Sequence, residues 1–109
     1  MEENRSKYEA VEELASGVLK LMEELYQSGF DTVHDSTLRD LQRAAERTGR
    51  CGMQYLSKLL SELSDEISAG RHRMEADTER MASVYTGICE YLYLCTQKSA
   101  YDRGLDYYS

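Results

Sequence analysis

The chain has 109 residues, a length that suits one domain with a single modest core. Hydrophobic residues make up 41% and charged residues 30%, which excludes a disordered chain. The net charge is −7, and a surface this acidic repels phosphate backbones, so we expect no general nucleic-acid binding.

Helix formation is favoured along the whole chain. The sequence contains no proline, and the strong helix formers Leu, Glu, Arg, Met, Ala and Lys dominate its middle. Proline removes a backbone donor and clashes within a helix, so its absence leaves long helices uninterrupted. We therefore expect an all-α fold in one domain over residues 1–109, an antiparallel helix bundle of three long helices and one short helix.

The first predicted helix runs from about Ser6 to Ser28. Gly29 follows it, where a left-handed residue is expected to end the helix. In the linker of residues 30–34, Phe30 and Val33 are expected to tuck beneath the bundle. The inward stripe of the helix recurs at three- and four-residue steps: Val11, Leu14, Val18, Leu21 and Leu25.

The short second helix is predicted to end near Thr48, and three residues in a row could cap its start: Asp35, Ser36 and Thr37. Gly49 and Gly52 are expected to bracket the turn that follows. The inner face of this helix would carry Leu38, Leu41, Ala44 and Ala45. The third helix is predicted over 52–69, with the strongest amphipathic pattern of the chain: Met53, Leu56, Leu59, Leu60, Leu63 and Ile67.

The boundary after the third helix has two possible positions. Gly70 could end the helix, or the break could come later, with Asp77 or Thr78 as the new cap. The last helix is predicted over 77–99, and the tail of residues 101–109 has no clear period. The inner seam of the last helix would consist of Met81, Val84, Ile88, Leu92 and Cys95.

Targeting features are also missing from the sequence. No apolar run approaches the roughly 20 residues needed to span a bilayer. The first residues are acidic and lack the apolar core of a signal peptide. The three cysteines are an odd number without framework spacing, which favours reduced thiols. We therefore expect a cytoplasmic protein that does not bind membranes.

We find no residue pattern that indicates catalysis or cofactor binding. Metalloprotease, P-loop and dinucleotide signatures are absent, as is the Glu-x-x-His pair of di-iron bundles. His34 and His72 lie near predicted connections without acids or cysteines at ligand spacing. Cys89 and Cys95 are six residues apart, about 120° around a helix, so they do not share a metal. We expect no metal, no cofactor and no enzyme.

One alternative to a non-catalytic protein involves Cys51. This cysteine is flanked by glycines at a predicted helix start, where the helix dipole lowers a thiol pKa. A nucleophile also needs a base and an orienting group, and the sequence does not show whether His34 or His72 reaches Cys51. A structural or incidental thiol is the simpler interpretation.

Arginines line one side of the predicted second helix. Arg39, Arg43, Arg47 and Arg50 recur at steps of four, four and three residues. Guanidinium groups suit carboxylate or phosphate partners, which makes this stripe a candidate partner-binding surface. The alternative is that the arginines face the acidic first helix or simply water, since exposed ion pairs contribute little.

Tyrosines are concentrated in the last quarter of the chain, where Tyr85, Tyr91 and Tyr93 lie on the last predicted helix. Tyrosine is enriched at binding surfaces because it buries a large ring and keeps a polar tip. These three are therefore candidate partner-binding residues, and packing at the bundle edge is the alternative. The remaining tyrosines of this region lie in the tail: Tyr101, Tyr107 and Tyr108.

A pattern of leucines and glycines across the middle of the chain resembles a helical region that accompanies bacterial SWIM zinc-finger proteins. The resemblance covers roughly residues 18–95, and Arg71-His72-Arg73 would be its basic turn. The chain lacks the Cys-x-Cys and Cys-x-His ligands of a SWIM finger, so neither zinc nor a nucleic-acid role carries over. The pattern runs through Leu25, Gly29, Phe30, Leu38, Leu41, Gly52, Leu56, Leu59, Leu60 and Leu63.

The resemblance implies an accessory helical module, since such proteins accompany MoxR-type ATPases and von Willebrand-type domains. We therefore expect a non-catalytic protein-interaction module of a bacterial cytoplasmic assembly, with a protein partner and a possible homodimer. The alternative is a small acidic phage or mobile-element inhibitor of a bacterial defence system, which would occupy a basic groove in place of nucleic acid.

Overall fold

The structure, a computed structural model, describes residues 2–72 and 78–108. Four α-helices and one turn of 3-10 helix account for nearly all of them, so the predicted all-α class is confirmed. The elements are α1 (Glu2–Ser28), η1 (Phe30–Thr32), α2 (Asp35–Arg50), α3 (Gln54–His72) and α4 (Thr78–Tyr108).

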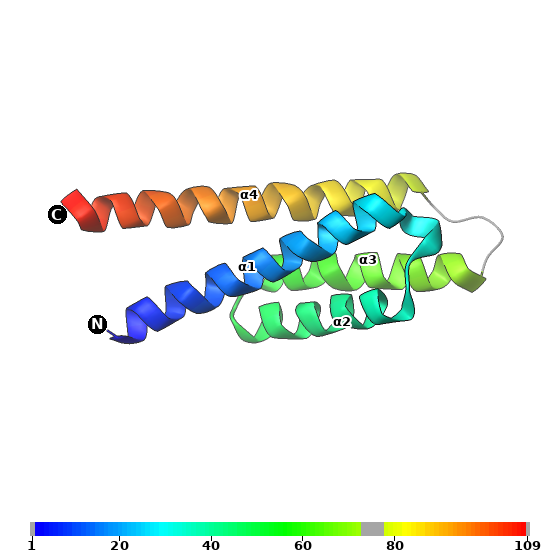
Figure 1. Cartoon of the computed structure of the whole chain (residues 1–109), viewed down its shortest axis with the longest axis horizontal. Helices are drawn as coiled ribbons and strands as arrows, with labels where there is room; N and C mark the ends of the chain where they lie inside the picture. Colours follow the sequence, from blue (N-terminus) through cyan, green and yellow to red (C-terminus); the bar gives the residue numbers. More distant parts are fainter. Residues whose placement is uncertain (1, 73–77, 109) are drawn as a thin grey trace.

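The four helices run alternately up and down, and both ends of the described chain lie at the same end of the bundle (Figure 1). Consecutive helices pack side by side, and α4 returns to pack against α1. In the described part of the chain, α2 and α4 therefore stand at diagonally opposite corners of the bundle. As predicted, α2 is the short helix, and α1 and α4 extend beyond it at the end that carries the termini (Figure 1).

Several helix ends differ from the prediction. α2 begins at Asp35 with His34 in the cap position, and the His34 side chain makes no capping hydrogen bond. The expected caps at Asp35, Ser36 and Thr37 are therefore wrong. Asp35 instead lies in the first turn, where a carboxylate stabilises the partial positive charge of the helix N-terminus.

The other differences lengthen helices. α1 is already helical at Glu2, and α4 continues to Tyr108 through the tail for which no helix was predicted. Once a helix is nucleated, each further residue adds a hydrogen bond, and no proline stops it. α3 passes Gly70 and reaches His72, which favours the later of the two breaks. Residues 73–77, including the candidate cap Asp77 and part of the predicted basic turn, lie outside the described residues.

The core follows the predicted inward faces closely. All six predicted inward residues of the third helix are buried, and so are four of the five on α4; Cys95 is half-buried. On α1, Val18 and Leu25 are buried, and Met22, which falls outside the predicted stripe, joins them. Each fully buried leucine contributes about 1.5–3 kcal/mol relative to an exposed one. Partly buried residues complete the α1 side: Val11, Leu14 and Leu21.

The linker after α1 behaves as predicted. Gly29 has φ 79° and ψ 160°, and its amide donates to the carbonyl of Leu25 at 2.8 Å. The positive φ is costly for any residue with a Cβ atom, which explains the glycine. Val33 is buried, and Phe30 is half-buried against the core, so both residues tuck beneath the bundle.

The α2–α3 hairpin is closely packed, because small residues line its contact. Gly49 lies inside α2 rather than in the turn, and a Cβ atom built on it would come within 3.1 Å of Ser57 Oγ. The Ser57 hydroxyl donates to the Ala45 carbonyl at 2.6 Å, which joins the two helices. The buried Thr48 hydroxyl is satisfied by the Ala44 carbonyl at 2.8 Å. Gly52, with φ 83°, makes the turn itself.

Candidate interaction surfaces

Tyr85 is half-buried and contributes to packing between helices. Its hydroxyl donates to the Met22 carbonyl at 3.1 Å, which ties α4 to α1. Its ring meets Phe30 edge-on, with centroids 5.8 Å apart, an arrangement that aromatic pairs prefer. Burial is the main cause that raises the pKa of Tyr85, and the nearby Cys89 thiol adds to it. Tyr85 therefore belongs to the packing of the bundle and not to an exposed contact surface.

Tyr91 packs against an aromatic residue that the sequence analysis did not single out. Its ring lies 5.7 Å from that of Tyr55 on α3, tilted by 47°. Tyr91 is half-buried, and burial raises the pKa of its hydroxyl. The exposed Tyr55 could have been found from the helix period alone, because it lies next to the inward Leu56 and outside the apolar stripe.

Tyr93 is the predicted tyrosine that faces solvent. It is 65% exposed, its neighbour Leu94 is 64% exposed, and Tyr55 is 59% exposed. Tyr93 and Leu94 follow Glu90 by three and four residues, so both lie one turn beyond it on α4. We call Tyr55, Tyr91, Tyr93 and Leu94 the tyrosine face. The tail tyrosines 101, 107 and 108 lie outside the residues whose side chains are described.

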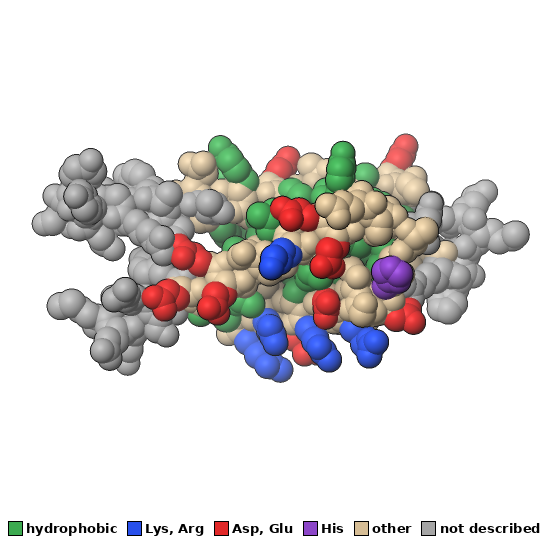
Figure 2. All heavy atoms as spheres, in the orientation of Figure 1, with side chains coloured by type: hydrophobic (Ala, Val, Ile, Leu, Met, Phe, Trp, Pro, Cys, Tyr) green, Lys and Arg blue, Asp and Glu red, His purple; other side chains and the backbone are tan. Residues whose placement is uncertain are grey.

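The arginine row is defined by Arg39, Arg43, Arg47 and Arg50, and all four side chains are exposed. They lie on the side of α2 opposite its buried face and protrude along the lower edge of the molecule (Figure 2). Within residues 2–72 and 78–108, Arg39, Arg43 and Arg47 form no ion pair. Arg50 reaches Glu46 at 4.0 Å in an exposed pair. The row therefore faces water and not the acidic first helix.

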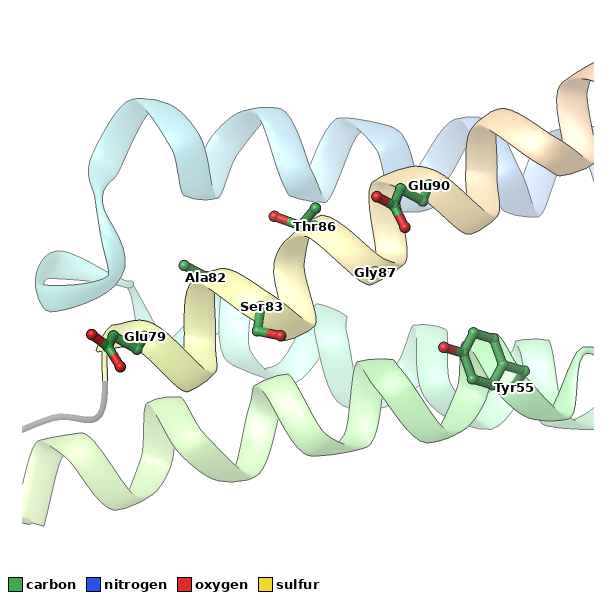
Figure 3. A pocket seen from close by; sticks show the side chains of 7 residues that line it. All are labelled: Tyr55, Glu79, Ala82, Ser83, Thr86, Gly87 and Glu90. Atoms are coloured by element: carbon green, nitrogen blue, oxygen red, sulfur yellow. The ribbon is translucent and has the colours of Figure 1, made fainter.

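A groove runs between α3 and α4, on the face turned away from α1 and α2 (Figure 3). Glu79 and Glu90 stand along it on α4, and the exposed ring of Tyr55 lines it from α3. The residues of α4 that line the groove between the two glutamates have short side chains, so the groove is shallow, and its lining is a mixture of polar and apolar groups. These short residues are Ala82, Ser83, Thr86 and Gly87.

Cys51 does not meet the conditions for an activated nucleophile. It is exposed at the C-terminal cap of α2, and its amide donates to the Arg47 carbonyl at 3.1 Å. The predicted helix-start position is therefore wrong, because α3 begins only at Gln54. His34 lies at the other end of α2, about 24 Å away along a helix of this length. The His72 side chain lies outside the described residues.

The other two thiols are half-buried on α4. Burial raises the pKa of the Cys89 thiol, and a hydrogen bond with Tyr85 partly opposes that shift. Burial therefore keeps this thiol protonated at neutral pH, which makes it a poor nucleophile. Among the described residues, no group of three or more His, Cys, Asp or Glu side chains is placed to hold a metal ion.

Comparison of the chain with family models, with curated proteins and with solved structures found no match. The resemblance to the helical region of SWIM zinc-finger proteins therefore stays a prediction. Within the part of the chain that the structure describes, none of the helices combines the length and apolar character needed to cross a membrane.

Proposed function

We propose that the protein is a non-catalytic accessory interaction module of a bacterial cytoplasmic assembly, and that the tyrosine face binds its protein partner. The exposure of Tyr93 and Leu94 carries this proposal. Two large side chains that are consecutive on α4 are 65% and 64% exposed, and Tyr55 of α3, which contacts Tyr91 of α4, is 59% exposed. Tyrosine is among the residues that most often anchor protein interfaces, and exposed apolar surface around such a ring marks an interaction site.

The described tyrosines of α4 divide into those that stabilise the fold and one that is available for binding. Tyr85 contributes to the fold through its hydrogen bond and its contact with Phe30, and Tyr91 contributes through Tyr55. Tyr93 and Leu94 can therefore be removed with little effect on the bundle, since most of each side chain is already in water. This makes them better test positions than Tyr91.

The proposal is tested by capturing partners from the source lysate with the tagged protein and with a Tyr93→Ala/Leu94→Ala variant. We expect the wild-type chain to retain a partner in stoichiometric amount. The double variant should capture less of this partner by a factor of more than about ten, as is typical when an interface anchor is removed. The matched control is Tyr26→Ala, which removes an 80%-exposed ring from α1.

Two outcomes would contradict the proposal. Equal capture by the wild-type chain and the double variant would exclude the tyrosine face as the contact. Loss of helical circular dichroism in the double variant would show that Tyr93 and Leu94 belong to the core.

A second candidate function is inhibition of a nucleic-acid-binding protein by an acidic surface, as in a phage protein that opposes a defence system. The charge distribution favours it, because α2 carries four arginines and three acids, so the acidic excess lies on the rest of the chain. In that case the captured partner would bind nucleic acid, and added DNA would release it. A partner that DNA does not release would exclude this alternative.

A further inference from the structure

We propose that the arginine row of one copy of this protein docks into the α3–α4 groove of a second copy. The proposal goes beyond the function proposed above, because it concerns self-association and rests on charged side chains, not on Tyr93 and Leu94. It starts from the unpartnered outer face of α2, where Arg39, Arg43 and Arg47 form no ion pair with any described residue.

The groove offers the opposite charge at the same spacing. Glu79 and Glu90 are 11 residues apart on α4, and Arg39 and Arg50 are also 11 residues apart on α2. In an α-helix 11 residues make slightly more than three full turns, so each pair lies on one face and spans about 16 Å. A helix laid along the groove therefore places an arginine near each glutamate.

The groove also has room for that helix. The residues of α4 that line the groove between Glu79 and Glu90 have short side chains, which lets a second helix approach α4 closely (Figure 3). The hydroxyls of Ser83 and Thr86 can accept hydrogen bonds from the inner arginines, Arg43 and Arg47. The exposed ring of Tyr55 lines the groove, where a guanidinium group can stack on it.

The two surfaces cannot meet within one molecule, since α2 and α4 stand at opposite corners of the bundle. Their contact is therefore head-to-tail: the copy that fills a groove presents its own groove to the next copy. Contacts of this type produce chains or rings, whereas a two-fold dimer would join identical surfaces. Charge pairs at such a contact weaken with salt, so association should be strongest at low ionic strength.

The test uses two neutralised variants. In one, the four arginines of the row, Arg39, Arg43, Arg47 and Arg50, are replaced by Gln, and in the other Glu79 and Glu90 are replaced by Gln. We expect the wild-type chain to form species that grow with concentration in sedimentation velocity, and each variant to stay at the monomer mass of 12.5 kDa. In an equimolar mixture, the intact groove of the arginine variant should bind the intact row of the glutamate variant. The heterodimer should grow no further, because its other row and its other groove are neutralised.

A Glu23→Gln/Glu24→Gln variant is the matched control, since it removes two exposed carboxylates from α1 and should associate like the wild-type chain. Raising the ionic strength from about 0.1 M to about 1 M shortens the Debye length from about 10 Å to about 3 Å and should dissociate the wild-type species. Helical circular dichroism checks that every variant is folded.

Several results would overturn the proposal. A wild-type chain that stays monomeric at low salt would do so, as would a dimer that stops growing with concentration. Self-association that survives in either variant would mean that other residues make the contact. A variant mixture without the heterodimer would show that the row and the groove do not bind each other.

Discussion

α3 and α4 lie side by side along one groove, yet they are held in the bundle in different ways. α3 buries the leucines of two adjoining rows, with Leu56, Leu60 and Leu63 fully covered, and it is joined to α2 through Ser57. α4 buries a narrower seam and is tied to α1 by the Tyr85 hydroxyl. The contrast indicates that the α2–α3 hairpin carries much of the stability, which leaves the outer side of α4 available for contacts.

The largest expected effect comes from a cavity beneath α3. Leu60 is fully buried, so Leu60→Ala should lower the free energy of unfolding by about 2–5 kcal/mol, from lost burial and the cavity together. Leu94→Ala removes the same atoms from a side chain that is 64% exposed, and should change stability by less than about 0.5 kcal/mol. Urea denaturation of both variants measures the difference, and similar losses would contradict the assignment of Leu60 to the core and of Leu94 to the surface.

A smaller effect is expected at the turn that begins the hairpin's second helix. Gly52 has φ 83°, so Gly52→Ala forces a Cβ atom into a left-handed conformation and should cost about 1–2 kcal/mol. Gly17 lies within α1 with open space around its Cβ position, so Gly17→Ala should stabilise the protein by about 0.5–1 kcal/mol. Thermal unfolding would show the two midpoints moving in opposite directions; a shift of the same sign would refute the conformational argument at Gly52.

The smallest effect concerns the tie between α4 and α1. Tyr85→Phe keeps the ring but removes the hydrogen bond to Met22, which should cost about 0.5–1.5 kcal/mol near neutral pH.

The same substitution should change how stability depends on pH. The pKa of Tyr85 is raised above 10.0 in the folded protein, so its stabilising contribution is fully present below pH 10.0 and is lost as the pH rises through the folded-state value. The wild-type chain should therefore lose its advantage over Tyr85→Phe above that pH. Urea titrations at neutral and alkaline pH measure the difference in the free energy of unfolding between the two chains. A difference that does not change with pH would mean that the Tyr85 hydroxyl does not contribute.

The sequence predicted the buried residues better than the helix ends. Inward positions such as Leu56 and Ile88 follow from the helix period, which depends only on neighbouring residues. The start of α1 and the end of α4 were missed, because a helix continues at little cost where no stop signal occurs. The sequence predicts Gly49 in the turn, but its small size allows Ser57 of the next helix to approach α2 closely.

The candidate surfaces were predicted only in part, for a similar reason. The spacing of the arginines on α2 predicted a stripe, and the structure keeps it as the arginine row. The spacing of the tyrosines could not separate Tyr85 from Tyr93, because Tyr85 contacts Met22 and Phe30, which belong to other elements. The outward position of Tyr55 follows from the helix period, whereas its contact with Tyr91 depends on how α3 and α4 pack.

The sequence by itself determined that the chain is helical and which side of each helix faces inward, since helix propensity and the 3.6-residue period are local properties. Only the tertiary structure decided which helices are neighbours. That order leaves the arginine row facing water and sets Glu79 and Glu90 along an open groove. It also places the arginine row and the groove on opposite sides of the bundle. Packing between distant segments determines such surfaces, and the period of a single helix carries no information about its neighbours.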